Sequence, residues 1–418
     1  MKRLMCFALL LGVLTVAFQS AQDNRSGTGS VVYEDLFKYS PRRITTDKEK
    51  NNAIETVCNK MHSVTGKDAH PTEEKMLHDF AGNEFLAVGF GDLGYGILNV
   101  ANGDVVELAP FSKPPFDWGM ENLVYVPWSG FFSKKGAHYY SLFTGEAVSL
   151  EAQEKFRNEN KQFVFRSIKD ASLRNKKGFE LCGSSPMNHK EADEGLIYAD
   201  VEVPYSWYFK RNISEYPYNE TGYCGYVAAS MLLGYNEIFA SAGYFSADEA
   251  TTYITPYVGS RISDTEWDGV PEISDSFPTD IWGEDIGGAV PGDIHSAVDS
   301  FLKGKGKRYD VYDFVWYFST VTDPIKDGVP AAYFGSMTEP SGGSFFHVVT
   351  AYGYYKDSGD LLVHYGWDGY SQVVMSQLGM FARGGVLAVY NKHQHVHGDY
   401  FIDEKDHKHY CACGEVLS

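Results

Sequence analysis

The sequence predicts an α+β fold, and three patterns support this prediction. Residues 84–108 contain apolar runs separated by turn residues, as antiparallel strands do. The segments that begin at Cys224 and Asp293 have the composition and spacing of helices. Short apolar segments bounded by turn residues then predict further strands at residues 329–334, 347–354, 361–365 and 385–390.

The chain begins with a segment typical of a secretory leader. Met1-Lys2-Arg3 is followed by an apolar stretch of roughly 15 residues, shorter than the about 20 residues that a membrane-spanning helix needs. We therefore expect a signal peptide over residues 1–21, with cleavage near Ala17 or Ala21. The mature chain is expected to be secreted and to have no membrane-spanning segment.

Composition and charge narrow the class of protein. The 418 residues carry 55 acidic against 36 basic side chains, and a formal net charge of -19 would repel the phosphates of nucleic acids, so we expect no nucleic-acid partner. The 29 tyrosines and 27 phenylalanines are typical of a folded, strand-rich protein. One of the six cysteines lies in the leader, and the odd number that remains is too small for a disulfide scaffold and leaves at least one thiol unpaired.

Residues 22–150 are expected to form a small α+β domain. Its helix candidates are residues 53–60 and 72–80, and its strand candidates are residues 84–90, 95–100 and 104–108. The dipeptide Asn102-Gly103 separates the last two segments and is a strong hairpin signal.

Two segments differ in composition from the predicted domains. Residues 151–203 are polar and charged and are expected to be a linker that is open to proteolytic cleavage. Residues 392–418 form a tail with five histidines and the pair Cys411 and Cys413. Imidazole and thiolate are zinc ligands, but their spacing here fits no standard zinc finger. We interpret the tail as a solvated or surface-associating segment, with metal binding as the alternative, and we expect no cofactor.

Cys224 is the residue on which the expected function depends. A turn rich in glycine and polar groups gives way at this position to an apolar, helix-forming run, so the cysteine begins a helix. Unpaired backbone N–H groups and the positive end of the helix dipole favour thiolate over thiol at such a position. The alternative is that Cys224 is a small apolar packing residue.

A thiol that attacks a carbonyl group needs a base, a group that orients the base, and donors for the developing oxyanion. His347 is the expected base, because a glycine-rich approach and an apolar strand place its imidazole at the mouth of a sheet. One strand later, His364 or Asp368 is expected to bond the distal nitrogen of His347, and Trp367 to shield the pair from water. The alternative for both His347 and His364 is a purely structural role.

These motifs resemble those of papain-fold cysteine peptidases, most closely the secreted bacterial streptopain-like branch. The resemblance covers about residues 204–391 and rests on a helix-starting Cys-Gly-x-x-Ala, the strand His-Val-Val-x-x-x-Gly-Tyr that begins at His347, and a polar-x-Gly-Trp bend that ends at Trp367. It implies a papain-like domain in which the helix bearing the cysteine packs on an antiparallel sheet or half-barrel. It also implies that residues 22–150 are a prosegment.

The resemblance further implies roles for single residues. Cys224 would be the nucleophile, and His347 the general base and acid. Papain-like enzymes use a glutamine six residues before the cysteine as oxyanion donor; this chain has Tyr218 there, so the amide of Asn219 is the expected substitute.

Three more positions complete the expected site. The family typically has asparagine where this chain has His364, which would here orient the base. Gly343 and Trp367 would contact the substrate.

The expected function is that of a secreted cysteine endopeptidase, made as a zymogen, that hydrolyses protein or peptide bonds through a thioester. Its partners would be a protein or peptide substrate and its own prosegment as inhibitor, and it would be a monomer. A cell-wall amidase with the same Cys-His pair is one alternative, although such enzymes usually have aspartate directly before the cysteine, where this chain has Tyr223. A catalytically silent surface-binding protein with a metal-binding tail is the other.

Overall fold

The computed structural model describes residues 43–145, 147–150, 153–154, 195–210, 223–240, 243–254, 273–274, 276–283, 291–305, 309–316, 322–334, 347–367, 369–376, 384–391, 401–402 and 409–410. These residues belong to one compact unit, Arg42–Ser418. The expected signal peptide lies outside the described residues, as do most of the expected linker and tail. Residues 43–150 are called the N-terminal half below, and residues 195–391 the C-terminal half.

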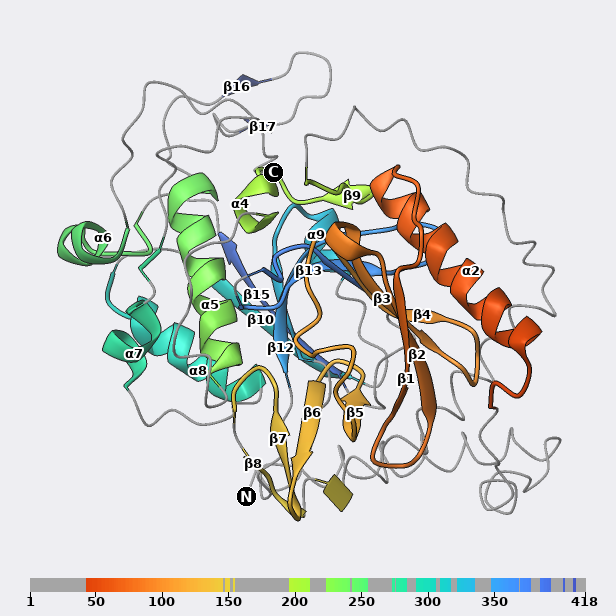
Figure 1. The fold of residues 1–418 in the computed structure, drawn as a ribbon. Helices are drawn as coiled ribbons and strands as arrows, with labels where there is room; N and C mark the ends of the chain where they lie inside the picture. Colours follow the sequence, from red (N-terminus) through yellow and green to blue (C-terminus); the bar gives the residue numbers. More distant parts are fainter. Residues whose placement is uncertain are drawn as a thin grey trace, which may run out of the picture. The chain divides into compact units, whose positions relative to one another are not determined.

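The N-terminal half contains one long helix and a group of mostly antiparallel strands (Figure 1). Its elements are α2 (Asp47–Thr65), β1 (Glu73–His78), β2 (Glu84–Gly89), η2 (Gly91–Leu93), β3 (Gly94–Asn99), β4 (Val105–Pro110), β5 (Leu123–Val126), β6 (Gly130–Lys135), β7 (His138–Ser141) and β8 (Ala147–Val148). The three predicted strands of this half correspond to β2, β3 and β4, and β3 pairs with β4 as the predicted hairpin.

Capping residues define both ends of helix α2. The Thr46 side chain accepts the N–H of Glu49, while the Glu49 carboxylate accepts the N–H of Thr46, which is a capping box. Gly66 ends the helix in the left-handed conformation, with φ 69°. Val57 and Met61 are fully buried on the side that faces the strands. The predicted helix at residues 53–60 is confirmed and is longer than expected.

The prediction of a helix at residues 72–80 is wrong, because this segment forms strand β1. It pairs with β2 along its whole length, from Glu73 opposite Gly89 to His78 opposite Glu84. Its glutamates and lysine favour a helix locally, but pairing with a buried neighbouring strand satisfies its backbone and buries Leu77.

The C-terminal half combines helices with a second group of antiparallel strands. Its helices are α4 (Trp207–Lys210), α5 (Cys224–Tyr235), the π-helical η3 (Asn236–Ala240), α6 (Ala247–Tyr253), α7 (Phe277–Trp282), α8 (Pro291–Leu302) and α9 (Thr322–Lys326). Its strands are β9 (Val201–Glu202), β10 (Tyr309–Trp316), β11 (Ala331–Phe334), β12 (Val348–Tyr354), β13 (Leu361–His364), β14 (Val373–Met375) and β15 (Gly384–Asn391). The α+β class is thus confirmed, and β9, β10 and β14 have no counterpart among the predicted strands.

One sheet connects the strands of both halves. In the described part of the chain its order is β10-β15-β11-β12-β13-β14-β4-β3-β2-β1-β5-β6-β7-β8, with β9 also paired to β12. The halves meet where β14 pairs antiparallel with β4, at Val374 opposite Leu108 and Met375 opposite Glu107. The N–H of Ser376 donates to the carbonyl of Val106 at 3.1 Å and extends this pairing. We call the β4–β14 contact the seam.

Helix α5 packs on strands β11 and β12 of the C-terminal half, and all of its residues are buried (Figure 1). The Thr350 hydroxyl of β12 contacts the sulfur of Met231 in α5 at 3.3 Å. Because both surfaces are apolar, this packing fixes the start of the helix relative to the start of β12.

The last residues of the expected linker are attached to the C-terminal half. Strand β9 pairs with β12, with Glu202 opposite Gly353. The N–H of Ile197 donates to the Gln372 side chain at 2.9 Å. The boundary of the C-terminal half therefore lies before these residues. In the tail, β16 (Phe401–Ile402) pairs with β17 (His409–Tyr410).

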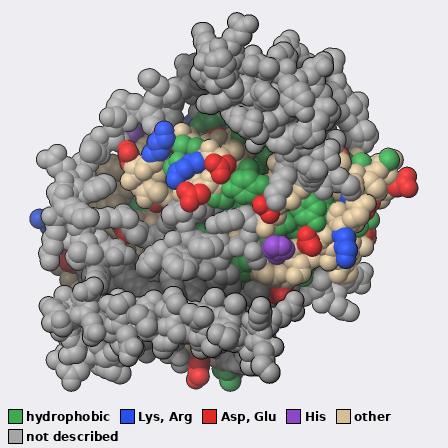
Figure 2. Space-filling model, turned by 180° about the vertical axis from the view of Figure 1, so that it is seen from behind, with side chains coloured by type: hydrophobic (Ala, Val, Ile, Leu, Met, Phe, Trp, Pro, Cys, Tyr) green, Lys and Arg blue, Asp and Glu red, His purple; other side chains and the backbone are tan. Residues whose placement is uncertain are grey.

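The described surface is mixed in charge on the face shown in Figure 2. Acidic and basic side chains lie close together there, beside a small group of hydrophobic side chains. Among the helices that the structure describes, none has both the length and the apolar character that crossing a bilayer requires.

Candidate active site

Cys224 is the first residue of α5, as the sequence predicts. Its side chain is 6 % exposed and lies among apolar neighbours. The backbone N–H groups of Cys224 and Gly225 contact the sulfur, and so does the N–H of Val348. Val348 begins β12 and directly follows His347. The fold therefore brings the predicted nucleophile to the residue next to the predicted base.

The hydrogen bond of His347 fixes which of its nitrogens carries the proton. Its Nε2 lies 2.8 Å from the backbone carbonyl oxygen of Tyr365. A carbonyl oxygen only accepts, so Nε2 must be the protonated nitrogen. The neutral ring then has its lone pair on Nδ1, which is the form that a general base requires.

Aromatic rings enclose the imidazole of His347. Trp367 stacks on it with a centroid distance of 4.1 Å and an interplanar angle of 13°. Tyr365 contacts it edge-on at 5.3 Å and 82°. The expected shielding of the base by Trp367 matches this geometry, and the rings leave the imidazole 7 % exposed.

Burial sets the protonation states of both groups. It raises the pKa of the Cys224 thiol to about 11, and the three backbone N–H groups oppose this shift only in part. It lowers the pKa of His347 to about 3, opposed by the hydrogen bond to Tyr365. Between these values both the Cys224 thiol and the His347 imidazole are neutral. A thiolate–imidazolium pair would need a less buried site.

The expected role of His364 requires a correction. The Tyr365 carbonyl, and not His364, accepts the Nε2 proton of His347. The Nδ1 of His364 instead accepts the N–H of Gly366 at 2.8 Å, and its ring is 1 % exposed. The side chain closes the turn after β13 rather than orienting the base.

Three other expected residues lie outside the described part of the chain. They are Asn219, the expected oxyanion donor, Gly343, the expected substrate contact, and Asp368, the other expected partner of His347. Their roles stay predictions.

Burial of His364 predicts a measurable loss of stability in acid. Burial lowers its pKa from 6.5 to about 3. The unfolded chain therefore binds a proton below about pH 6.5 that the folded chain does not, and the free energy of unfolding falls as pH decreases from there towards 3. His364→Asn keeps an acceptor for Gly366 without titrating. In denaturant unfolding, this variant should show a slope of the free energy of unfolding against pH that is smaller by up to about 1.4 kcal/mol per pH unit in this range. An unchanged slope would contradict the lowered pKa of His364.

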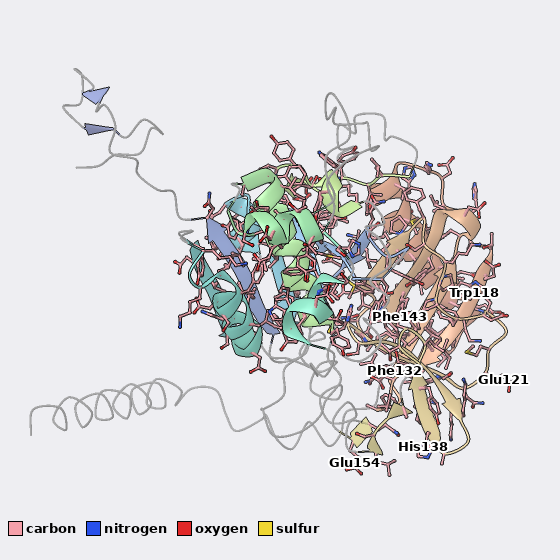
Figure 3. The ribbon with its side chains drawn as sticks, turned by 90° about the vertical axis from the view of Figure 1, so that its left-hand side faces the viewer. Trp118, Glu121, Phe132, His138, Phe143 and Glu154 are labelled. Carbon is pink, nitrogen blue, oxygen red and sulfur yellow. The ribbon has the colours of Figure 1, made fainter. Side chains whose placement is uncertain are left out.

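The N-terminal half also contributes to the surroundings of His347, which sequence reasoning missed. The ring of Phe143, in the turn between β7 and β8, stacks on Trp367 with a centroid distance of 4.3 Å and an angle of 6°. Phe143 lies on the inner side of its half, whereas Trp118 and Glu121 lie at the outer side (Figure 3). Since His347 is also nearly parallel to Trp367 and equally close, the two rings must lie on opposite faces of the indole. Phe143, Trp367 and His347 thus form one stack.

A buried carboxylate at the seam also forms hydrogen bonds to the residues around His347. Glu107 of β4 is 1 % exposed. It accepts the hydroxyls of Tyr95 at 2.8 Å, Tyr125 at 3.0 Å and Tyr365 at 3.1 Å. Burial raises the pKa of Glu107, while the three hydrogen bonds lower it. Tyr365 is therefore held by its hydroxyl to one half while its carbonyl holds His347 in the other.

Removing the Glu107 carboxylate is expected to destabilise the fold markedly. Glu107→Ala leaves three buried tyrosine hydroxyls without their acceptor and should lower the free energy of unfolding by roughly 3 kcal/mol. Denaturant unfolding followed by fluorescence would measure this. Glu121→Ala, at an exposed glutamate of the same half, should change it by less than about 0.5 kcal/mol. Equal effects of the two changes would refute the role given to Glu107.

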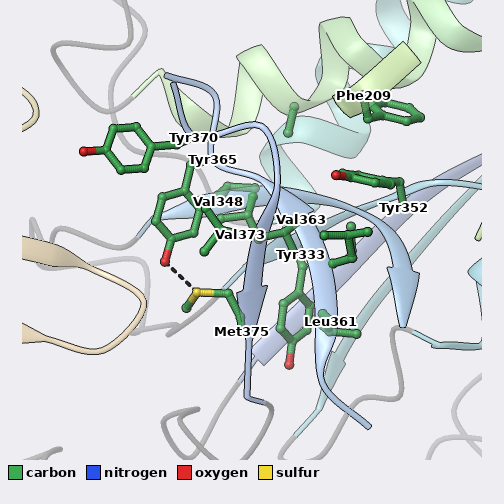
Figure 4. Packing of buried hydrophobic residues seen from close by; sticks show 14 of the residues in the cluster. Phe209, Tyr333, Val348, Tyr352, Leu361, Val363, Tyr365, Tyr370, Val373 and Met375 are labelled. Carbon is green, nitrogen blue, oxygen red and sulfur yellow. Dashed lines mark hydrogen bonds between the residues drawn. The ribbon is translucent and has the colours of Figure 1, made fainter. Parts of the chain in front are cut away.

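More contacts join the two halves close to the site. The Ser112 hydroxyl donates to the carbonyl of Gly369, and the Tyr370 hydroxyl donates to the carbonyl of Lys113. The side chains of Tyr365 and Tyr370 lie next to each other in this region, and the Tyr365 hydroxyl contacts the Met375 sulfur (Figure 4). The N-terminal half is thus packed against the residues that surround His347.

The chain matches no protein-family model, and no curated protein matches it at a significant level.

Proposed function

We propose that this chain is the latent form of a secreted, papain-like cysteine peptidase, whose N-terminal half is an inhibitory prosegment. The proposal depends mainly on one observation. The sulfur of Cys224 contacts the backbone N–H of Val348, and the preceding residue, His347, donates its Nε2 proton to the carbonyl of Tyr365. A thiol at a helix start and a nearby base in the correct tautomer are the minimum that thiol-dependent acyl transfer needs, and the proposal is that the two side chains meet in the active enzyme.

The residues would act in the following order. Nδ1 of His347 takes the thiol proton as the sulfur of Cys224 attacks the carbonyl carbon of the scissile bond. The tetrahedral intermediate collapses when Nδ1 returns the proton to the leaving amine, which breaks the C–N bond and leaves a thioester. Nδ1 then takes a proton from water, whose oxygen attacks the thioester carbon. As the C–S bond breaks, Nδ1 returns this proton to the sulfur, which releases the acid and restores the thiol.

Hydrogen-bonding groups of the backbone and of one side chain would stabilise the charges that develop in these steps. The N–H of Cys224, at the start of α5, is a donor for the oxyanion, and the amide of Asn219 is the proposed second donor. The Tyr365 carbonyl keeps the proton on Nε2 and stabilises the imidazolium that forms.

Latency follows in this proposal from the contacts of the N-terminal half. Phe143 covers Trp367, and the seam and Glu107 hold the half against Tyr365. These contacts support the burial that keeps Cys224 and His347 neutral. Cutting the linker and separating the halves would expose the site.

A casein-cleavage assay tests the proposal. The purified chain is cut in the linker by limited proteolysis, the added protease is inhibited, and cleavage of casein is measured with and without iodoacetamide. Cleavage that appears after the cut and disappears on alkylation is expected. Casein that stays intact under all conditions would refute the proposed activity.

A catalytically silent binding protein is the second candidate, because the pair is neutral in this structure. A thiol with a pKa of about 11 beside an imidazole with a pKa of about 3 is not a reactive pair. If Cys224 alkylates no faster after the linker is cut, this candidate is favoured over the peptidase.

A further inference from the structure

One peptide group is hydrogen-bonded to two buried histidines. Its carbonyl, that of Tyr365, accepts the Nε2 proton of His347 at 2.8 Å. Its N–H, that of Gly366, donates to Nδ1 of His364 at 2.8 Å. In a trans peptide group the carbonyl and the N–H point in opposite directions, so the two rings bond its opposite ends. We call His347, the Tyr365–Gly366 peptide group and His364 the peptide bridge.

His364 has the protonation state that the peptide bridge requires. Its Nδ1 accepts a hydrogen bond, so the proton of the neutral ring is on Nε2. A charged ring would carry a proton on both nitrogens and could not accept the N–H of Gly366. Burial lowers the pKa of His364 to about 3, so the ring is neutral and Nδ1 remains an acceptor at any pH well above this value.

The other nitrogen of His364 makes the placement of this ring costly. Its Nε2–H is buried and has no hydrogen-bond partner among the residues that the structure describes. An unpaired buried donor costs free energy, which an apolar side chain of similar size would avoid. Within the described part of the chain, the bond to Gly366 is therefore the polar interaction by which this imidazole offsets the cost of its burial.

Other hydrogen bonds hold the turn but leave the orientation of this peptide group to the histidines. The N–H of Tyr365 donates to the carbonyl of Tyr370 at 2.9 Å, and the N–H of Tyr370 donates to the carbonyl of Trp367 at 3.2 Å. Neither bond involves the carbonyl of Tyr365 or the N–H of Gly366. Gly366 has φ 82°, a conformation that glycine adopts without strain. The two histidines therefore oppose rotation of the peptide group from both ends.

A peptide group that donates its N–H is a stronger acceptor at its carbonyl. Hydrogen bonds in series polarise one another, by roughly 10–30 % per bond. The bond to His364 thus strengthens the bond from His347 and keeps the Tyr365 carbonyl directed at Nε2. In the proposed mechanism this carbonyl also stabilises the imidazolium that forms when Nδ1 takes the thiol proton.

We propose that His364 is a positioning residue that acts through the backbone: it holds and polarises the Tyr365–Gly366 peptide group, which in turn orients the imidazole of His347. The catalytic part of this inference rests on the proposed peptidase function. The peptide bridge itself is a property of the latent chain and is tested without any activity.

NMR of the full-length Cys224→Ala chain with 15N-labelled histidines tests the peptide bridge. The Nε2 proton of His347 is identified as the signal that a further His347→Gln change removes. His364→Leu deletes the acceptor for the N–H of Gly366. The Nε2 proton of His347 should then move upfield and exchange faster with water, because its bond to Tyr365 weakens. His364→Asn, whose side-chain oxygen can accept the same N–H, should restore the signal.

Thr350→Val is the matched control. Thr350 lies directly opposite His364 in the pairing of β12 with β13, is 1 % exposed, and contacts the sulfur of Met231 through its hydroxyl. The change removes a buried polar group beside His364 but leaves the peptide bridge intact, so the His347 signal should not move. Equal shifts in Thr350→Val and His364→Leu, or a shift in neither, would overturn the inference.

A second measurement needs no substitution at His364. In the uniformly 15N-labelled full-length chain, the amide nitrogen of Gly366 and Nδ1 of His364 should show a scalar coupling across their hydrogen bond. This measurement decides the question even if His364→Leu does not fold. Absence of the coupling would overturn the peptide bridge.

The catalytic part is tested on the chain after its linker is cut. His364→Leu should lower the kcat for peptide cleavage at least about tenfold and change KM by less than about threefold. His364→Asn and Thr350→Val should keep most of the kcat. An unchanged kcat in His364→Leu would overturn the positioning role. Absence of cleavage by every chain, the unmodified one included, would refute the peptidase and with it the catalytic part, while the NMR signals still decide the peptide bridge.

Discussion

Replacing Cys224 by alanine is expected to lower the kcat for casein cleavage by the linker-cut chain by a factor of at least about 10⁴. The change removes the sulfur, which is the only protein atom that becomes covalently attached to the substrate in the proposed mechanism. Alanine fits the buried start of α5, so folding should be retained. Circular dichroism of the variant would check this.

Cys58 supplies the control for this experiment. It is a second free thiol, half-buried on α2 in the N-terminal half, whereas Cys224 begins α5 in the C-terminal half. Cys58→Ala should cleave casein at a rate close to that of the unmodified chain. Activity that survives in Cys224→Ala, or is lost in Cys58→Ala, would remove Cys224 from the role of nucleophile.

Separating the halves is expected to raise the rate at which iodoacetamide alkylates Cys224 at pH 7 by roughly 10² or more. In the intact chain burial raises the pKa of this thiol to about 11, so at pH 7 only about one molecule in 10⁴ carries the thiolate. Loss of the N-terminal half admits water, which lowers the pKa of Cys224 and raises that of His347.

The dependence of the alkylation rate on pH shows in which direction separation shifts the pKa of Cys224. In the intact chain the rate should keep rising with pH towards about 11, while in the separated enzyme it should level off at a lower pH. Mass spectrometry of the Cys224 peptide measures this rate in both samples, and the Cys58 peptide of α2 supplies an internal reference in the intact chain. Superimposable Cys224 profiles before and after separation would show that the N-terminal half does not control the thiol.

Sequence patterns predicted the parts of the site that depend on local structure. A change from turn residues to an apolar helical run marks the start of α5, and a glycine-rich approach to an apolar strand marks His347. Because both signals belong to a few neighbouring residues, they survive in a single sequence. The segment of β1 shows the limit of such signals, since its local helix preference was overridden by pairing with β2.

The parts that were missed depend on contacts between distant segments. The acceptor for His347 is a backbone carbonyl, which every residue has, so Tyr365 carries no recognisable signal for this role. Glu107 sits among apolar residues of β4, and nothing near it in sequence shows that three tyrosines from other elements surround it. The contact of Phe143 with Trp367 likewise joins residues far apart in the chain.

The seam has a consequence for the C-terminal half if it is separated from the N-terminal half. With β4 gone, β14 becomes an edge strand whose backbone N–H and C=O groups face outward between apolar side chains. Such an edge is a template for strands of other molecules, including a second copy with the same exposed edge. The separated C-terminal half is therefore expected to self-associate as its concentration rises, and sedimentation velocity before and after separation would detect this.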